Sequence, residues 1–233
     1  MAIFLDTSRL DLIEKAMSMG IIRGVTTNSA IIIKEREPSK SFPLEEMVRA
    51  IATAINPYPL SVEVTTNEPG AMVEQAREFS SWAENIVVKI PVHGPDGELE
   101  NIRVAHELEK KYDIRVNLTA MMSAQQCLIG ALAGVTYVSI FGGRVSNMGY
   151  DAREEIRKAR HVIEAHQLPA KIIVGSTREI VNVIEWLDAG AHIVTVLPEF
   201  LWGMIRHPYT KETVQSFLHQ AEKFIQDQTK LAK

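Results

Sequence analysis

Short apolar runs alternate with amphipathic segments along the whole chain. The runs are rich in isoleucine and valine, and they are apolar at nearly every position instead of at every second one. That pattern is typical of parallel strands covered on both faces. We therefore predict eight buried strands, over residues 2–5, 24–27, 61–64, 86–90, 114–118, 137–141, 171–174 and 192–196.

The segments between these strands have the period of a helix. Leu44, Met47, Val48 and Ile51 follow the spacing i, i+3, i+4 and i+7, which places them on one helical face. The last such segment, residues 210–228, is long for a helix that closes a domain. We expect it to reach over a neighbouring subunit.

The expected helix ends carry their own signals. Ser8 with Asp11 predicts a capping box, in which each side chain bonds a free backbone N–H of the first turn, and Ser176 with Glu179 predicts a second one. Glycine favours the left-handed conformation that stops a helix. The glycines at expected stops are Gly20, Gly134 and Gly190.

Eight strands alternating with helices fit two topologies, a (β/α)8 barrel and an open doubly wound sheet. A dinucleotide-binding sheet needs a glycine-rich turn after its first strand. Here that strand is followed by Asp6, Thr7, Ser8 and Arg9. We predict an α/β fold, a single (β/α)8 TIM barrel domain over residues 1–233 with an extended C-terminal helix, because 233 residues suit one such barrel.

Charge narrows the class of ligand. The chain has 25 Lys and Arg against 29 Asp and Glu, a formal net charge of −4, and its pI is near 6.0. A mildly acidic chain without a basic run is a poor binder of nucleic acid. An anionic ligand must therefore be held by a local site and not by the field of the whole protein.

The cellular compartment follows from what the chain lacks. Its one cysteine, Cys127, excludes an intramolecular disulfide and fits a reducing compartment. The apolar runs are much shorter than a membrane span, and the N-terminus has no signal-peptide layout. We predict a cytoplasmic protein with no membrane partner.

Polar residues gather where the predicted strands end. In a barrel these carboxyl ends converge on one mouth, where such enzymes keep their active sites. So many polar positions are hard to explain by packing, and we take them as a candidate site. The residues are Asp6, Thr26, Thr27, Asn28, Glu63, Lys89, Asn117, Thr119, Ser139, Phe141, Arg144, Ser176 and Arg178.

Lys89 is the most informative of these residues, because it lies inside the apolar run Ile86-Val87-Val88-Lys89-Ile90-Pro91. Removal from water disfavours the charged form of an amine. A free amine attacks a ketone and forms an imine, which accepts the electrons of a breaking C–C bond. The simpler alternative is a structural lysine paired with a carboxylate such as Glu63.

The remaining residues could divide the other tasks. Asp6 and Glu63 could serve as acid and base, although each could instead form a salt bridge, and Asp6 could cap a helix. Arg144 and Arg178 form a candidate anion clamp, and glycines beside them, Gly143 among them, could bring backbone N–H groups to an anion. Surface ion pairs are the plain alternative for both arginines. The seven histidines show no metal-ligand spacing, so we predict no metal.

The chain resembles the small transaldolases and the related fructose-6-phosphate aldolases over nearly its whole length. The resemblance rests on several motifs in order: Phe4-Leu5-Asp6-Thr7, Gly24-Val25-Thr26-Thr27-Asn28, Val87-Val88-Lys89-Ile90-Pro91, Asn117-Leu118-Thr119 and Phe141-Gly142-Gly143-Arg144. It implies a class I aldol enzyme without a cofactor. It also implies a ring-like homo-oligomer, a pentamer or a decamer.

The resemblance implies the roles of four catalytic residues. Lys89 is similar to the lysine that forms the Schiff base. Asp6 is similar to the acid and base at the C4 hydroxyl of the substrate. Glu63 and Thr119 are similar to the pair that holds a catalytic water.

The resemblance also implies how the substrate is bound. Asn28 and Asn117, helped by Ser139, are similar to the donors to the dihydroxyacetone hydroxyls. Arg144 and Arg178 are similar to the anion-binding pair.

Two positions favour transfer over simple cleavage. Relatives that act as plain aldolases carry Gln where this chain has Glu63, and Tyr where it has Phe141. The resemblance therefore implies transfer of a dihydroxyacetone unit from a 6-anionic ketohexose to an aldose phosphate such as glyceraldehyde 3-phosphate. Cleavage without transfer, and a sugar-anion binding barrel without catalysis, are the alternatives.

The chain departs from the family pattern at the mouth. The family reads Thr-Thr-Asn-Pro-Ser after the second strand, where this chain continues with Ser29 and Ala30. The expected loop after the sixth strand, residues 142–149, is also unusual. Both changes resemble those expected of 6-deoxy-6-sulfofructose transaldolases, so we expect this sugar sulfonate as the donor, with the sugar phosphate fructose 6-phosphate as the alternative.

Overall fold

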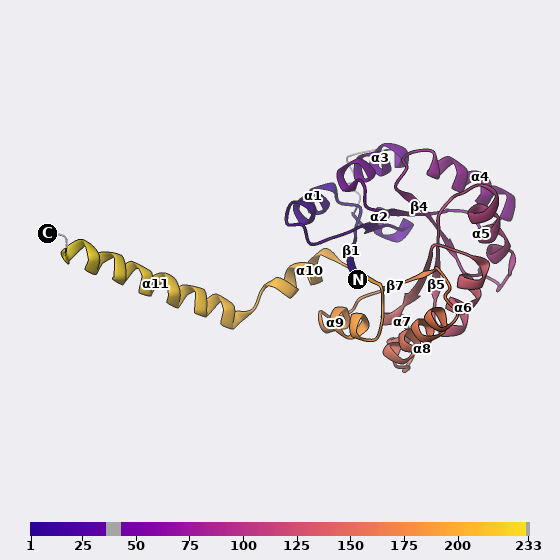
Figure 1. Cartoon of the computed structure of the whole chain (residues 1–233). Helices are drawn as coiled ribbons and strands as arrows, with labels where there is room; N and C mark the ends of the chain where they lie inside the picture. The colour runs from indigo at the N-terminus through magenta and orange to yellow at the C-terminus, as the bar shows by residue number, and fades with distance from the viewer. Residues whose placement is uncertain (36–42, 232–233) are drawn as a thin grey trace. The chain divides into compact units, whose positions relative to one another are not determined.

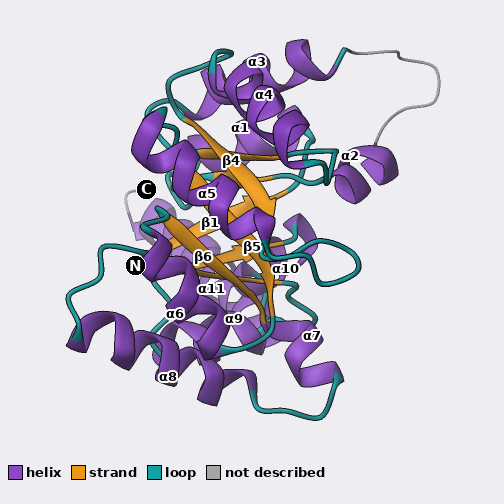
Figure 2. Cartoon of the chain, turned by 90° about the vertical axis from the view of Figure 1, so that its right-hand side faces the viewer, coloured by secondary structure: helices purple, strands orange, loops and turns teal. Residues whose placement is uncertain are grey.

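The computed structural model describes residues 1–35 and 43–231, which form two compact units, Met1–Pro198 and Glu199–Lys233. In the first unit eight parallel strands close into a barrel in chain order (Figures 1 and 2). This confirms the predicted barrel. The strands are β1 (Ala2–Asp6), β2 (Val25–Thr26), β3 (Leu60–Glu63), β4 (Ile86–Pro91), β5 (Val116–Met121), β6 (Tyr137–Phe141), β7 (Lys171–Gly175) and β8 (Ile193–Val196).

Helices surround the strands, as Figure 2 shows. In α3 the predicted apolar face turns inward: Val48 and Ile51 are fully buried, and Leu44 and Met47 are half-buried. The helices of the first unit are α1 (Leu10–Ser18), α2 (Ser29–Glu35), α3 (Leu44–Ile55), α4 (Pro69–Ser80), α5 (Glu100–Lys111), α6 (Ala124–Ala133), α7 (Gly142–Asn147), α8 (Ala152–Ala165) and α9 (Val181–Asp188).

Both predicted capping boxes are wrong. The N-cap of α1 is Arg9, and the backbone N–H and hydroxyl of Ser8 donate to Glu35 on α2, at 2.6 and 2.8 Å. Ser176 has a left-handed φ of +63°, and α9 begins only at Val181. The signal was misread because a Ser-x-x-acid pattern also occurs in loops that bond elsewhere. Gly134, by contrast, does cap α6 in the left-handed conformation.

The segment after β6, expected as a loop, is the short helix α7. Its first two residues, Gly142 and Gly143, are buried and lie close to neighbouring groups. A Cβ on Gly142 would stand 2.7 Å from the Trp186 ring, and one on Gly143 would stand 1.9 Å from the Ser176 carbonyl oxygen. Close packing therefore requires both glycines.

A layer of apolar side chains fills the barrel interior. It consists of Phe4, Val87, Tyr137, Ile173 and Ile193, each from a different strand. Side chains two residues apart on a strand point to the same face. The residues two positions further along these strands are polar or small, and they stand directly above this apolar floor: Asp6, Lys89, Ser139, Gly175 and Thr195.

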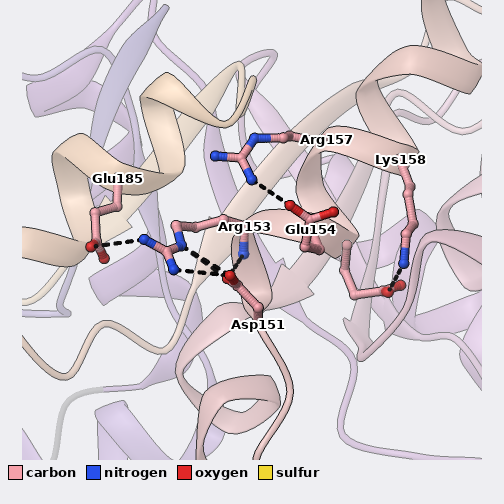
Figure 3. Close-up of polar contacts among 7 residues, drawn as sticks. Asp151, Arg153, Glu154, Arg157, Lys158 and Glu185 are labelled. Atoms are coloured by element: carbon pink, nitrogen blue, oxygen red, sulfur yellow. Dashed lines mark hydrogen bonds and ion pairs between the residues drawn. The ribbon is translucent and has the colours of Figure 1, made fainter.

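An ion pair of Arg153 joins the outer helices α8 and α9. Figure 3 shows Arg153 bonded to Asp151, the N-cap of α8, at 2.9 Å and to Glu185 of α9 at 3.5 Å. Asp151 also accepts the backbone N–H of Arg153. These side chains are largely exposed, so we treat them as local supports of the helix start and not as a site.

The second unit contains α10 (Pro198–Ile205), apart from its first residue, and the 24-residue helix α11 (Pro208–Leu231). The helix extends beyond the predicted range 210–228 at both ends. Phe217, Leu218 and Phe224 are 64%, 60% and 65% exposed. An apolar stripe of this kind needs a surface to cover it. Among the described residues, no helix is long and apolar enough to cross a membrane.

Candidate active site

One cavity of about 510 Å³ opens among the carboxyl ends of the strands. Twelve of the fourteen residues named as candidates for the site line it. They are Asp6, Thr26, Asn28, Glu63, Lys89, Asn117, Thr119, Ser139, Phe141, Arg144, Ser176 and Arg178. The barrel closes because each strand pairs with the next, and this closure brings together residues up to 172 positions apart in the chain.

Thr27 does not line the cavity but accepts the Lys89 Nζ through its carbonyl oxygen, and Gly143 does not line it either. The role of Gly143 in the structure is to let α7 approach the carbonyl of Ser176, which lies in the loop after β7. This close packing explains why a glycine is needed there, and the expectation that its N–H group binds an anion stays a prediction.

Lys89 lies in the fourth strand with its side chain 5% exposed. Its neighbours across the sheet are Glu63 on β3 and Asn117 on β5. The Nζ atom donates to the carbonyl oxygen of Thr27 at 2.9 Å. Within the described part of the chain, Lys89 forms no ion pair with a carboxylate, so the alternative of a structural Lys89–Glu63 pair has no support.

Asp6 ends β1 and lies in the same interior layer. Its Oδ1 accepts the hydroxyl of Thr26 at 2.7 Å. Burial raises the pKa of Asp6 above its ordinary value of 3.8, while the nearby charge of Lys89 and the Thr26 bond act in the opposite direction. A carboxyl group with a raised pKa can both accept and return a proton near neutral pH.

Neutral hydrogen-bonding groups are linked across three strands. The Oδ1 of Asn117 accepts the hydroxyl of Ser139 at 2.6 Å, and its Nδ2 donates to the hydroxyl of Ser61 at 3.1 Å. All three residues are buried. Bonds on both sides fix the amide plane of Asn117 beside Lys89, which suits a group that must hold a substrate hydroxyl in one direction.

Thr119 stands where β5 departs from regular pairing. The register shifts between Leu118 and Met121, and Ala120 has a φ of +60°. The Thr119 hydroxyl is buried and has no hydrogen-bond partner among the described residues. A buried hydroxyl without a partner costs free energy, so this one is suited to bind a water or substrate group.

Asn28 combines two roles. Its Oδ1 accepts the backbone N–H of Ile31 at 2.9 Å, so it caps α2. It also lines the cavity, where its amide nitrogen makes no bond to the described residues. The cap orients the amide and leaves this nitrogen as a donor.

The two arginines lie at the mouth. The guanidinium of Arg144 stacks on the ring of Phe141, 5.3 Å from its centroid, which fixes the direction of a long side chain. The backbone N–H of Arg178 donates to the Oδ1 of Asn182 at 3.1 Å, which anchors the loop that carries it. The part of the chain that the structure describes contains no ion pair of either arginine, contrary to the simpler alternative.

Nine further residues line the cavity, and among them three polar side chains were not predicted. Thr195 on β8 and Thr177 after β7 are buried, and Lys34 comes from α2. Thr195 lay inside a predicted strand, and its polar character among Ile193, Val194 and Val196 was a usable signal. Thr177 and Lys34 had no such signal, because only the fold brings them to the mouth.

Among the described residues, no three His, Cys, Asp or Glu side chains cluster as a metal site requires.

Known proteins resemble this chain in sequence. The family model "Transaldolase/Fructose-6-phosphate aldolase" matches residues 3–233. A probable transaldolase of Desulforudis audaxviator is 38% identical over 218 residues, which cover 94% of this chain and 96% of that protein. A probable transaldolase 2 of Listeria monocytogenes is 36% identical over 226 residues, 97% of this chain and 98% of that one.

Solved structures resemble the chain in fold alone. A flavocytochrome b2 variant with sulfite bound superposes with a TM-score of 0.58 at 14% identity, over 86% of this chain and 57% of that one. A lactate oxidase of Pediococcus acidilactici gives a TM-score of 0.56 at 11% identity, over 84% and 62%. The chain thus spans less than two thirds of the length of these structures.

Proposed function

We propose that this chain, which belongs to the transaldolase/fructose-6-phosphate aldolase family, transfers a dihydroxyacetone unit through a Schiff base on Lys89. The observation that carries the proposal is the position of Lys89. It is buried in the cavity, its one hydrogen bond to the described residues is to the Thr27 carbonyl, and it shares the barrel interior with Asp6. Such an amine can attack a carbonyl once its single hydrogen bond is exchanged.

The reaction begins when Nζ of Lys89 attacks C2 of the ketose donor. Loss of the carbonyl oxygen as water leaves an iminium ion. Asp6 then takes the proton of the C4 hydroxyl, the C3–C4 bond breaks, and its electron pair moves into the iminium to form an enamine. The aldehyde product leaves, while the three-carbon unit stays bound to Lys89.

Transfer reverses these steps on a second aldehyde. The enamine carbon attacks the acceptor carbonyl, and Asp6 returns its proton to the new alkoxide. Water then hydrolyses the iminium and frees Lys89. Glu63 and Thr119 support this proton traffic: both line the cavity, Glu63 is next to Lys89 in the sheet, and the Thr119 hydroxyl is free to hold a water.

The donor is proposed to carry an anion at C6. Arg144 and Arg178 line the same cavity, without partners among the described side chains that would neutralise them. We propose 6-deoxy-6-sulfofructose as the donor and fructose 6-phosphate as the alternative, because Ser29 and Ala30 replace the family's Pro-Ser and both line the cavity. Glyceraldehyde 3-phosphate is the proposed acceptor.

Release without transfer is the competing reaction. Phe141 lies beside the cavity and presents a ring without a hydroxyl, and Glu63 provides a carboxylate. Both are the residues of transferring enzymes in the resemblance described above. We propose that the enamine therefore waits for an aldehyde instead of being rapidly protonated.

The proposal is tested by borohydride trapping. The intact protein is incubated with each donor and reduced, and the modified peptide is identified by mass spectrometry. We expect the added mass on Lys89, with none in Lys89→Ala and an unchanged yield in the exposed-lysine control Lys158→Ala. Turnover of both donors is then compared with and without glyceraldehyde 3-phosphate. Binding without an adduct would mean a non-catalytic sugar-anion barrel, and fast release without acceptor would mean a plain aldolase.

The exposed stripe of α11 supports a homo-oligomer. We propose that this helix packs on a second copy of the chain in a pentameric or decameric ring. Light scattering should report a smaller assembly for Phe217→Glu than for Ser216→Glu, a matched change at the neighbouring exposed position. A single domain over residues 1–233 and a cytoplasmic location stay predictions.

A further inference from the structure

We infer that Thr195 is a positioning residue for Asp6, which it orients through a hydroxyl chain that runs by way of Thr26. The inference rests on the proposed function, in which Asp6 moves the C4 proton. Thr195 does not itself meet the reacting atoms in this account.

The hydroxyl chain from Thr195 through Thr26 to Asp6 is defined by two short contacts. The Thr26 hydroxyl oxygen lies 2.7 Å from Oδ1 of Asp6 and 2.6 Å from the Thr195 hydroxyl oxygen. β1 pairs with β2 on one side and with β8 on the other, so the two threonines flank the strand of Asp6. They are only 3% and 6% exposed, so bulk water cannot take the place of either contact.

Counting hydrogens gives the chain its direction. Ionised Asp6 has no proton to give, so Thr26 must donate to it, and Thr195 must then donate to Thr26. When Asp6 is protonated it donates to Thr26, and Thr26 turns its hydrogen towards Thr195. Rotation of the two threonine hydroxyls therefore keeps both hydrogen bonds whether Asp6 is ionised or protonated, and neither threonine gives up its proton.

The methyl group of Thr195 helps to hold this geometry. A Cβ placed on Gly175 of β7 would meet the Thr195 Cγ2 at 3.1 Å, so the methyl group stands over this glycine. The absence of a side chain at Gly175 leaves room for the rotamer in which the hydroxyl points to Thr26.

Charges from three elements act on Asp6. Lys89 on β4 favours its ionised form, and Glu35 on α2 and Glu63 on β3 favour its protonated form. Burial raises the pKa of Asp6 further. A Thr26 hydroxyl that is itself bonded by Thr195 is a stronger and better aimed donor to the carboxylate. Loss of Thr195 should therefore make Asp6 harder to ionise and less well oriented.

The test uses Thr195→Val, which keeps the shape and removes the hydroxyl, and Thr195→Ser, which keeps the hydroxyl. We expect Thr195→Val to form the borohydride-trapped Lys89 adduct to the same extent as the natural chain. Its rate of C–C cleavage should fall about tenfold, the loss expected for one hydrogen bond. The acid limb of its pH profile should move up by about half a unit, and Thr195→Ser should restore most of both.

A titration separates this inference from the proposed function. The carboxyl carbon of Asp6 is followed by carbon-13 NMR against pH and assigned with Asp6→Asn. A rise of its pKa in Thr195→Val supports the hydrogen-bonded series Thr195–Thr26–Asp6 even if no adduct forms on Lys89. The inference would be overturned if the Asp6 titration were unchanged in Thr195→Val. It would also be overturned if adduct formation and cleavage fell equally while the pH profile did not move. Either result would leave the Schiff-base mechanism untouched.

Discussion

Lys89 and Glu63 are neighbours in the sheet, yet the Lys89 Nζ donates to the backbone carbonyl of Thr27 at 2.9 Å and not to the carboxylate. A backbone carbonyl is a neutral partner, so it satisfies one N–H of the amine without holding it as an ion pair. This arrangement keeps a buried amine available for covalent chemistry, and it makes the roles of the two side chains separable by mutation.

The first prediction concerns the nucleophile. Lys89→Ala should lower the transfer rate by about 10⁴-fold or more, because no other amine replaces it in the covalent step. Lys89→Arg keeps a cation and the hydrogen bond to Thr27 and should be equally inactive. Steady-state transfer assays with circular dichroism as a folding check measure this. Substantial activity in either folded variant would exclude the mechanism.

The second prediction separates imine formation from C–C cleavage. Asp6→Asn should still give a Lys89 adduct on borohydride reduction, while cleavage falls by about 10²–10⁴-fold, the usual contribution of a general base. In the natural chain the base must be ionised, so cleavage should slow as the pH falls through the pKa of Asp6. Because burial raises the pKa of Asp6 above its ordinary value of 3.8, this acid limb should lie above pH 3.8.

The pH profile of the same variant provides the control. Since asparagine does not titrate, the residual cleavage of Asp6→Asn should lack this acid limb. A limb that persists unchanged would assign it to another group and contradict the role of Asp6.

The third prediction concerns the anion clamp. Arg144→Lys keeps the charge but loses the planar fork and the stacking on Phe141. We expect KM for the anionic donor to rise about tenfold with a smaller change in kcat, since the lost contact binds substrate and transition state alike. Dihydroxyacetone, which has no anionic tail, is the control donor. An equal KM increase for it would indicate a distorted mouth instead.

Much of the fold could be read from the sequence, and the reason is physical. Strands buried on both faces must be apolar throughout, so their positions were visible, and β6 was predicted to the residue. The site could be read because a buried lysine such as Lys89 stands out in an apolar strand. Helix starts were less visible: Ser8 bonds to Glu35, 27 positions away, and no local pattern encodes such a contact.

Some cavity residues also could not be predicted, because contacts between distant segments place them there. Lys34 lies on a helix that also carries Ile31, and nothing local distinguishes it from an ordinary solvent-exposed lysine. Gly143 was predicted to bind an anion because a glycine beside an arginine is compatible with such a role. The structure adds a second reason for a glycine there, the nearness of Ser176, which depends on where helix α7 and the loop after β7 meet in space.

The fourth prediction tests that packing. Gly143→Ala would place a Cβ 1.9 Å from the Ser176 carbonyl oxygen, a contact that only a backbone shift can relieve. We expect a loss of about 3 kcal/mol in the free energy of unfolding, together with weaker donor binding because both Arg144 and Ser176 move. Ser146→Ala, an exposed change on the same helix, should leave both unchanged. Denaturant unfolding and KM measure the two effects, and a stable variant would refute the close contact.

The last prediction concerns stability in mild acid and the histidine that immediately precedes β8. Nδ1 of His192 accepts the backbone N–H of Ile172 at 3.0 Å, so this nitrogen must be unprotonated in the folded chain. Burial lowers the pKa of His192 to about 4, and the positive charges of Arg160 and Lys171 act in the same direction. The unfolded chain, with an ordinary pKa near 6.5, binds more protons between these values.

Stability should therefore fall as the pH drops from about 6.5 to about 4, and the contribution of His192 should be constant above that window. His192→Asn retains an oxygen acceptor for the Ile172 N–H and cannot titrate, so its Tm should fall less over the same range. Exposed His219→Gln should follow the natural chain. Scanning calorimetry at several pH values makes the comparison. Parallel curves for His192→Asn and the natural chain would show that acid instability arises elsewhere, because only the group whose protonation differs between the folded and unfolded states can produce the slope.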